Sequence, residues 1–82
     1  MAKIDFTTFI LSVSTAAYMG LGLVPSEEGK SPTLDLALAR QNIDLLELIF
    51  EKTKGNLTSE ESKLLESMLF ETRMKFLEAQ KG

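Results

Sequence analysis

The side chains that could do chemistry in this sequence form one short charged stripe. The chain has no cysteine and no histidine, which excludes thiol nucleophiles, iron–sulfur ligation and the commonest general base. Carboxylates, lysines and hydroxyls remain. At about 100° per residue of helix, four charged residues fall on one narrow face: Arg40, Asp44, Glu47 and Glu51. Such a stripe could bind a divalent cation or a small molecule if a second helix faced it with further ligands.

A solvated helix face is the simpler interpretation of this stripe. Arg40 and Asp44 are spaced i, i+4, and such surface pairs contribute roughly 0.2–0.5 kcal/mol to helix stability. Without cysteine or histidine, no activated nucleophile with an oriented base can be assembled. We therefore expect no catalytic residue, no cofactor and no metal, and a protein that is not an enzyme. Metal or small-molecule binding by the stripe is the weakest alternative.

The composition indicates one small acidic helical domain spanning residues 1–82. The chain is 44% hydrophobic and carries a formal net charge of −3. An acidic chain repels phosphate backbones, and the sequence has no basic stripe interleaved with aromatic residues, so nucleic acid is not an expected partner. A single copy of this size buries only about 63% of the surface of its extended chain. The chain can therefore form only one small hydrophobic core.

Three helices are expected to position these residues. The first, an apolar helix, spans residues 5–21, and its N-cap is Asp5. A polar linker with two prolines covers 22–32. Helical periodicity then predicts a second helix over 33–54 and a third over 58–79. The predicted fold is all-α, with the N-terminal helix packed on or beside a long antiparallel helical hairpin.

The turn between the second and third helices carries the strongest local signals. Gly55 is placed to end the second helix as a left-handed cap. Asn56 and Leu57 leave only a short turn, which favours an antiparallel hairpin. Thr58 and Glu61 have the spacing of a capping box, in which each side chain accepts a hydrogen bond from the backbone of the other residue.

The N-terminal third is uncharged over the 21 residues from Phe6 to Ser26. A membrane-spanning helix needs about 20 apolar residues. However, this segment contains five serines or threonines before Ala16, and it lacks the flanking charges that set membrane topology. Lys3 followed by Asp5 also makes a poor start for a secretory signal. We expect a cytoplasmic protein, with membrane anchoring by the first helix as the alternative.

The apolar surface exceeds what three helices in one copy can cover, which predicts a homo-oligomer, such as a two-fold dimer, or a module for an unidentified protein partner. Phe70, Met74 and Leu77 form a second apolar patch on the third helix, at i, i+4 and i+7, which either holds the first helix or forms an interface. Asn42 interrupts the apolar face of the second helix; it either fixes oligomer register or is satisfied by local backbone or water. The interface candidates are Phe6, Phe9, Val13, Ala16, Gly20, Phe70, Met74 and Leu77.

Two stretches of the sequence also carry a family resemblance. They are Ala39-Arg40-Gln41-Asn42-Ile43-Asp44-Leu45-Leu46 and the run from Glu51 to Glu61 that contains Lys-Thr-Lys-Gly-Asn-Leu-Thr. With the helix over 6–22 and the proline after it, the chain resembles the bacterial family catalogued as domain of unknown function 1844. Where relatives commonly have Leu-Arg, this chain has Thr72-Arg73. The resemblance implies bacterial origin and a helical domain, and it supplies no assigned activity.

Overall fold

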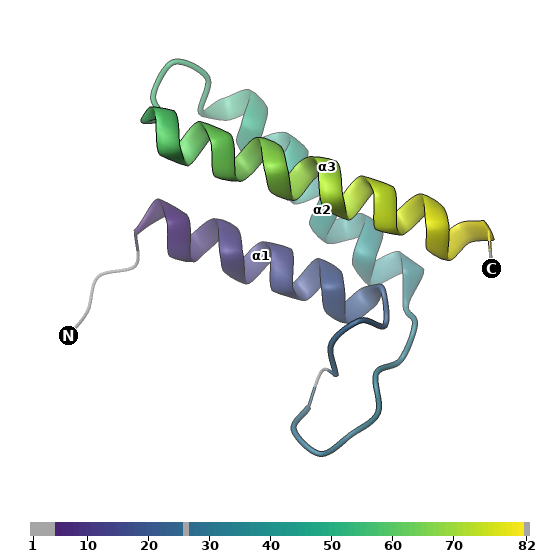
Figure 1. Ribbon diagram of the computed structural model, residues 1–82. Helices are drawn as coiled ribbons and strands as arrows, with labels where there is room; N and C mark the ends of the chain where they lie inside the picture. Colours follow the sequence, from purple (N-terminus) through teal and green to yellow (C-terminus); the bar gives the residue numbers. More distant parts are fainter. Residues whose placement is uncertain (1–4, 26, 82) are drawn as a thin grey trace.

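The computed structural model describes residues 5–25 and 27–81. It contains three α-helices, α1 (Phe6–Gly20), α2 (Leu36–Lys52) and α3 (Ser59–Lys81), which Figure 1 colours from purple to yellow. Apart from an isolated bridge between Leu21 and Leu34, the described residues form no β structure. The all-α prediction is therefore confirmed. The predictions that involve Lys3 and Ser26 fall outside the described residues.

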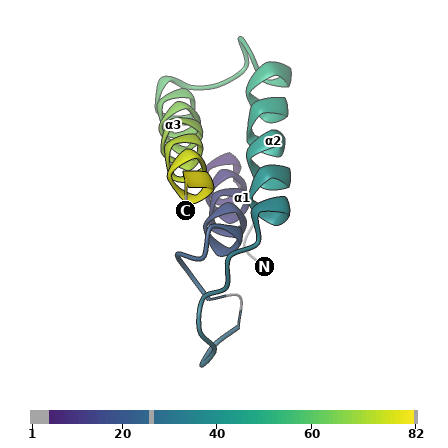
Figure 2. The same ribbon diagram turned by 90° about the vertical axis from the view of Figure 1, so that its right-hand side faces the viewer.

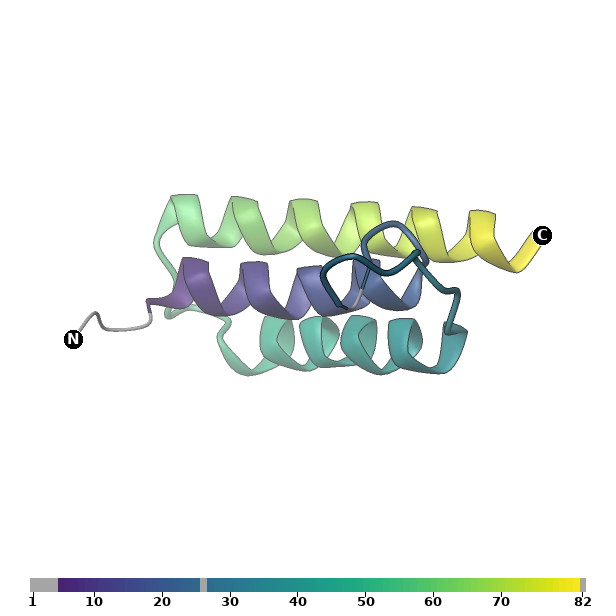
Figure 3. The ribbon, with the colours of Figure 1, turned by 90° about the horizontal axis from the view of Figure 1, so that it is seen from below.

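Each helix runs antiparallel to the next along the chain. In Figure 1, α1 and α3 lie in front and α2 crosses behind them, while Figure 2 shows α1 and α3 foreshortened and α2 beside them. All three pairs of helices are in contact. Figures 1 and 3 together show that the connection between α1 and α2 extends away from the helices, near the end of α1. The N-terminal helix thus packs on both helices of the hairpin.

The backbones of α1 and α2 approach each other closely at Gly20. A Cβ atom at this position would overlap the backbone nitrogen of Ala39 and lie 2.9 Å from the carbonyl oxygen of Asp35. Ala17, one turn earlier in α1, is fully buried, as is Ala39. Small side chains on both helices therefore allow the contact, and Gly20 is the residue that it requires.

The second helix begins three residues later than the sequence predicts, at Leu36 instead of residue 33. The reason is that Leu34 forms an antiparallel bridge with Leu21, which holds the chain extended there. The backbone nitrogen of Asp35 then donates to the carbonyl oxygen of Gly20 at 2.6 Å. Its side chain accepts from the nitrogen of Leu38 at 3.1 Å, so Asp35 is the N-cap of α2.

The buried hydrophobic residues form two clusters along the bundle, and all three helices contribute to both. One cluster contains Ile10, Val13, Leu46, Leu65 and Leu69. The other contains Ala17, Leu21, Ala39, Ile43 and Phe76. Fully burying one leucine or isoleucine stabilises the fold by about 1.5–3 kcal/mol, so these contacts hold α1 against the hairpin.

Three polar residues are buried in this core, and each one is satisfied by its own helix. The hydroxyl of Ser14 donates to the carbonyl oxygen of Ile10 at 2.8 Å, and that of Thr72 donates to Met68 at 2.7 Å. Asn42 donates its amide to Leu38 at 2.9 Å. The structure thus favours local backbone bonding for Asn42 over a role in oligomer register. No buried side-chain nitrogen or oxygen in the described part of the chain lacks a partner.

The turn between α2 and α3 differs from the prediction in the residue that caps α2. α2 ends at Lys52 and is capped by Thr53, so Gly55 is not the helix cap. Gly55 still has a left-handed φ of +83°, because it lies in a tight turn closed by a 2.9 Å bond from the nitrogen of Asn56 to the oxygen of Thr53. The capping box follows: the Thr58 nitrogen donates to Glu61 at 2.9 Å, and the Glu61 nitrogen donates to the Thr58 hydroxyl at 3.1 Å.

Replacing Gly20 with alanine tests the contact between α1 and α2. A glycine-to-alanine change in a helix normally stabilises a protein by roughly 0.5–1 kcal/mol. Here the added methyl group meets backbone that cannot rotate away, so we expect the free energy of unfolding to fall by about 1–3 kcal/mol in a denaturant titration. Ser12→Ala, on the exposed side of the same helix, is the control and should change little. Equal or higher stability of Gly20→Ala would contradict the close contact.

Candidate functional site

The charged stripe predicted from the sequence lies on the exposed side of α2, beside α3. Its carboxylates do not converge, because each one pairs with a different cation. Asp44 lies 3.1 Å from Arg40, and Glu51 lies 3.4 Å from Lys54. Both pairs are largely exposed, and exposed ion pairs contribute about 0–1 kcal/mol.

The arrangement gives no support to a metal centre in the stripe. Within residues 5–25 and 27–81, no three acidic side chains are grouped so that they could hold an ion. The guanidinium group of Arg40 packs against Phe76 of α3, because its central carbon lies 5.9 Å from the centre of the Phe76 ring. The stripe residues are therefore surface ion pairs that border α3, and they provide no set of converging ligands.

Arg73 ties α3 to α2, a role that the sequence interpretation missed. Its Nη2 atom lies 3.2 Å from Oε1 of Glu47, and its Nε atom donates to the same oxygen at 3.4 Å. Arg73 lies three residues after Phe70 and four before Leu77. This spacing places all three on one side of α3. The sequence alone does not place that side beside α2, because this depends on how the two helices pack.

The Glu47–Arg73 ion pair borders two shallow hollows between α2 and α3. The first, of about 310 Å³, is lined by Glu47, Phe50, Glu51, Glu66, Leu69, Phe70 and Arg73. The second, of about 280 Å³, is lined by Arg40, Ile43, Glu47, Arg73, Phe76, Leu77 and Gln80. We refer to them together as the α2/α3 groove. It has an apolar floor and a charged rim, and α1 contributes no residue to it.

The predicted patch of α3 lies beside this groove and is exposed. Phe70 is 65% exposed, Leu77 58% and Met74 44%. α1 does not cover them, because Ile10 and Val13 of α1 pack with Leu65 and Leu69 on another side of α3. The alternative in which this patch holds the first helix is therefore wrong, and we call the three residues the α3 patch.

The candidates on the first helix have different locations. Val13 and Gly20 are buried within the single chain, so they are core residues and not interface residues. The face they occupy is already taken by α2 and α3. Phe6 and Ala16 are half-buried, and only Phe9 is clearly exposed.

The outward face of α1 is nevertheless unusual, because α1 has no charged residue from Phe6 to Gly20. The hydroxyl of Ser12 donates to the carbonyl oxygen of Phe9 at 2.9 Å, and that of Thr15 donates to Leu11 at 2.8 Å. These exposed hydroxyls have partners in their own helix, so removing this face from water costs less than the number of polar residues suggests.

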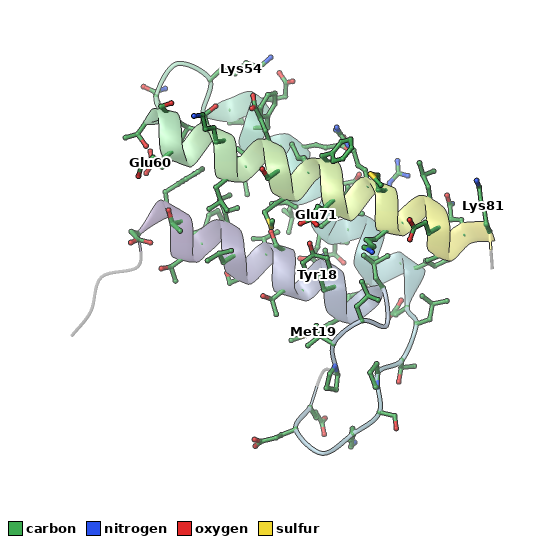
Figure 4. The ribbon with its side chains drawn as sticks, viewed as in Figure 1. Tyr18, Met19, Lys54, Glu60, Glu71 and Lys81 are labelled. Carbon is green, nitrogen blue, oxygen red and sulfur yellow. The ribbon has the colours of Figure 1, made fainter. Side chains whose placement is uncertain are left out.

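Tyr18 connects α1 to α3 at the edge of the bundle. Figure 4 shows it on α1, facing Glu71 of α3, and its hydroxyl donates to Oε2 of Glu71 at 3.4 Å. Partial burial raises the pKa of Tyr18 above its usual value of 10.0, and the nearby negative charge of Glu71 and this hydrogen bond raise it further. Tyr18 therefore reports on the docking of α1 against α3.

Comparison with known proteins gives one match. The family model described as Domain of unknown function (DUF1844) matches residues 3–78. No curated protein and no solved structure matches the chain. Over the residues that the structure describes, no helix is both long enough and apolar enough to cross a membrane.

The titration of Tyr18 tests the contact between α1 and α3. It is the only tyrosine, and the chain has no tryptophan, so ultraviolet absorbance follows this one phenol. We expect a pKa above 10.0 that moves back toward 10.0 in Glu71→Gln, while Glu78→Gln leaves it unchanged. Because the folded pKa is raised, the stabilisation from this site is complete below pH 10.0 and is lost as the pH rises through the folded pKa. A wild-type pKa of 10.0 or lower would rule out this contact.

Proposed function

This chain belongs to the DUF1844 family, and we propose that it is a non-catalytic helical module that acts by binding another protein chain, in the first place a second copy of itself. The family description names no activity. The proposal includes the bacterial, cytoplasmic setting expected from the sequence. It also retains the expectation that the protein is not an enzyme, which comes from a sequence without cysteine or histidine.

The exposed α3 patch carries the proposal. Phe70, Met74 and Leu77 are adjacent on one side of α3, while Leu65, Leu69 and Phe76 fill the core on another side. A helix with apolar residues on two sides needs two packing partners. α1 and α2 of the same chain supply only the inner contact. A second chain is the simplest partner for the outer one.

Association of α1 with a membrane surface is a second candidate function, favoured by the uncharged outer face of α1. The hydroxyls of Ser12 and Thr15 donate to carbonyl oxygens of α1 itself, which lowers the cost of burying that face in a lipid interface. Flotation with neutral phospholipid vesicles tests it. Cofloating of the wild type, lost in Leu11→Asp, would support this candidate; wild-type protein left at the bottom of the gradient would exclude it.

Light scattering on a size-exclusion peak tests self-association. We expect the wild type to have the mass of a dimer or a higher assembly. Phe70→Ser should weaken association about tenfold or more without loss of helicity, because it removes a largely exposed aromatic side chain from the interface. Leu23→Ser is the matched control: Leu23 is 53% exposed, lies in the connection after α1 and does not border the α2/α3 groove.

Two results of this experiment would contradict the proposal. A wild type that remains monomeric at every accessible concentration would overturn self-association. A dimer that Phe70→Ser leaves intact, but that Leu23→Ser weakens, would move the interface away from the α3 patch.

A further inference from the structure

We propose that the second copy binds antiparallel along α3, so that Phe70 of each copy packs against Leu77 of the other and Glu66 lies opposite Lys81. This inference rests on the proposed function, because it specifies the partner, direction and register of the same interface. It is argued from the spacing of the apolar residues, from the charges at the two ends of α3 and from the ion pair at its centre.

The apolar spacing on the outside of α3 is that of a helix-pairing seam. Phe70 and Leu77 are seven residues, or about 10 Å, apart along the helix. Arg73 and Met74 lie midway between them. Two identical helices related by a two-fold axis at this midpoint run antiparallel, and each Phe70 then meets a Leu77. In this register, Arg73 faces Met74 of the other copy at the centre.

The charges of α3 select the antiparallel direction. The last turn of α3 contains Lys81, and Figure 4 shows Lys81 at the end of the helix opposite to Glu60. In the register above, Glu60 and Glu61 of one copy lie beyond the end of the other, so the charges that can meet are Glu66 and Lys81. Glu66 lies four residues before Phe70, and Lys81 lies four residues after Leu77. Any register that opposes Phe70 to Leu77 therefore also opposes Glu66 to Lys81. A parallel pair would instead place like charges together.

The α2/α3 groove is likewise acidic at the end beside Phe70 and basic at the end beside Leu77. The hollow beside Phe70 is bordered by three carboxylates, Glu47, Glu51 and Glu66, and by one cation, Arg73. The hollow beside Leu77 is bordered by two cations, Arg40 and Arg73, and one carboxylate. A two-fold axis through the centre brings the acidic half of one copy against the basic half of the other. The surface is thus complementary to itself.

The centre of the seam can be buried because its charge is already paired. Arg73 would otherwise bring two cations close to the two-fold axis. Glu47 of the same chain lies 3.2 Å from its Nη2 atom, so each copy contributes a paired charge and the apolar stem of the arginine. Among the described ion pairs, neither Glu66 nor Lys81 takes part in one. Both are thus available to the second copy.

A reciprocal charge reversal tests the register. In Glu66→Lys alone, both contacts of the dimer become Lys against Lys, and in Lys81→Glu alone both become Glu against Glu. We expect each single variant to dimerise roughly tenfold more weakly in sedimentation equilibrium at low salt. In an equimolar mixture of the two variants, both contacts of the mixed dimer pair opposite charges, so dimerisation should return to the wild-type level. The double variant should also recover. Glu28→Lys, in the exposed connection, controls for net charge.

The outcomes separate this inference from the proposed function. A wild type that dimerises, with single variants that are weakened but not rescued by mixing, would overturn the antiparallel register while self-association stands. Single variants that dimerise as well as the wild type would also overturn the antiparallel register and leave self-association standing. A monomeric wild type would overturn both.

Discussion

The close contact between Gly20 of α1 and Ala39 of α2 is the constraint on which the rest of the fold depends. Only glycine leaves room for the backbone of α2 at this point. Because the two backbones touch, α1 lies deep enough to fill both hydrophobic clusters together with α2 and α3. The core is then complete within one chain. The opposite side of α3 receives no cover from α1, and this is why the α3 patch stays exposed beside the α2/α3 groove.

The polar residues divide in the same way between inside and outside. Ser14, Asn42 and Thr72 are buried but bond to their own helices, so the core needs no polar partner from another chain. Some of the charged side chains of α2 and α3, such as Arg40 and Glu66, instead border the α2/α3 groove, where Glu47 and Arg73 tie the two helices together. An interface built on this groove would combine an apolar seam with a charged rim, which is the usual anatomy of a protein–protein interface.

The sequence was sufficient for the features that depend on local chemistry. Helical periodicity gave the three helices, and the spacing of Thr58 and Glu61 gave the capping box, because both patterns involve neighbouring residues. It could not place the start of α2, which depends on a bridge between Leu21 and Leu34 on either side of the linker. It also could not separate core residues from exposed apolar residues. Val13 and Phe70 are both apolar residues on helix faces, and only the packing of the three helices shows that one is covered and the other is not.

The central claim, that the α3 patch is the surface for self-association, is tested most directly by backbone amide chemical shifts recorded over a dilution series. Exchange between monomer and dimer changes the environment of the interface residues first. The account predicts concentration-dependent shifts that centre on Phe70, Met74 and Leu77, with Thr8, Ser12 and Thr15 on the outer face of α1 unchanged. Shifts that centre on α1, or a protein with the mass of a monomer whose spectrum does not change with concentration, would contradict it.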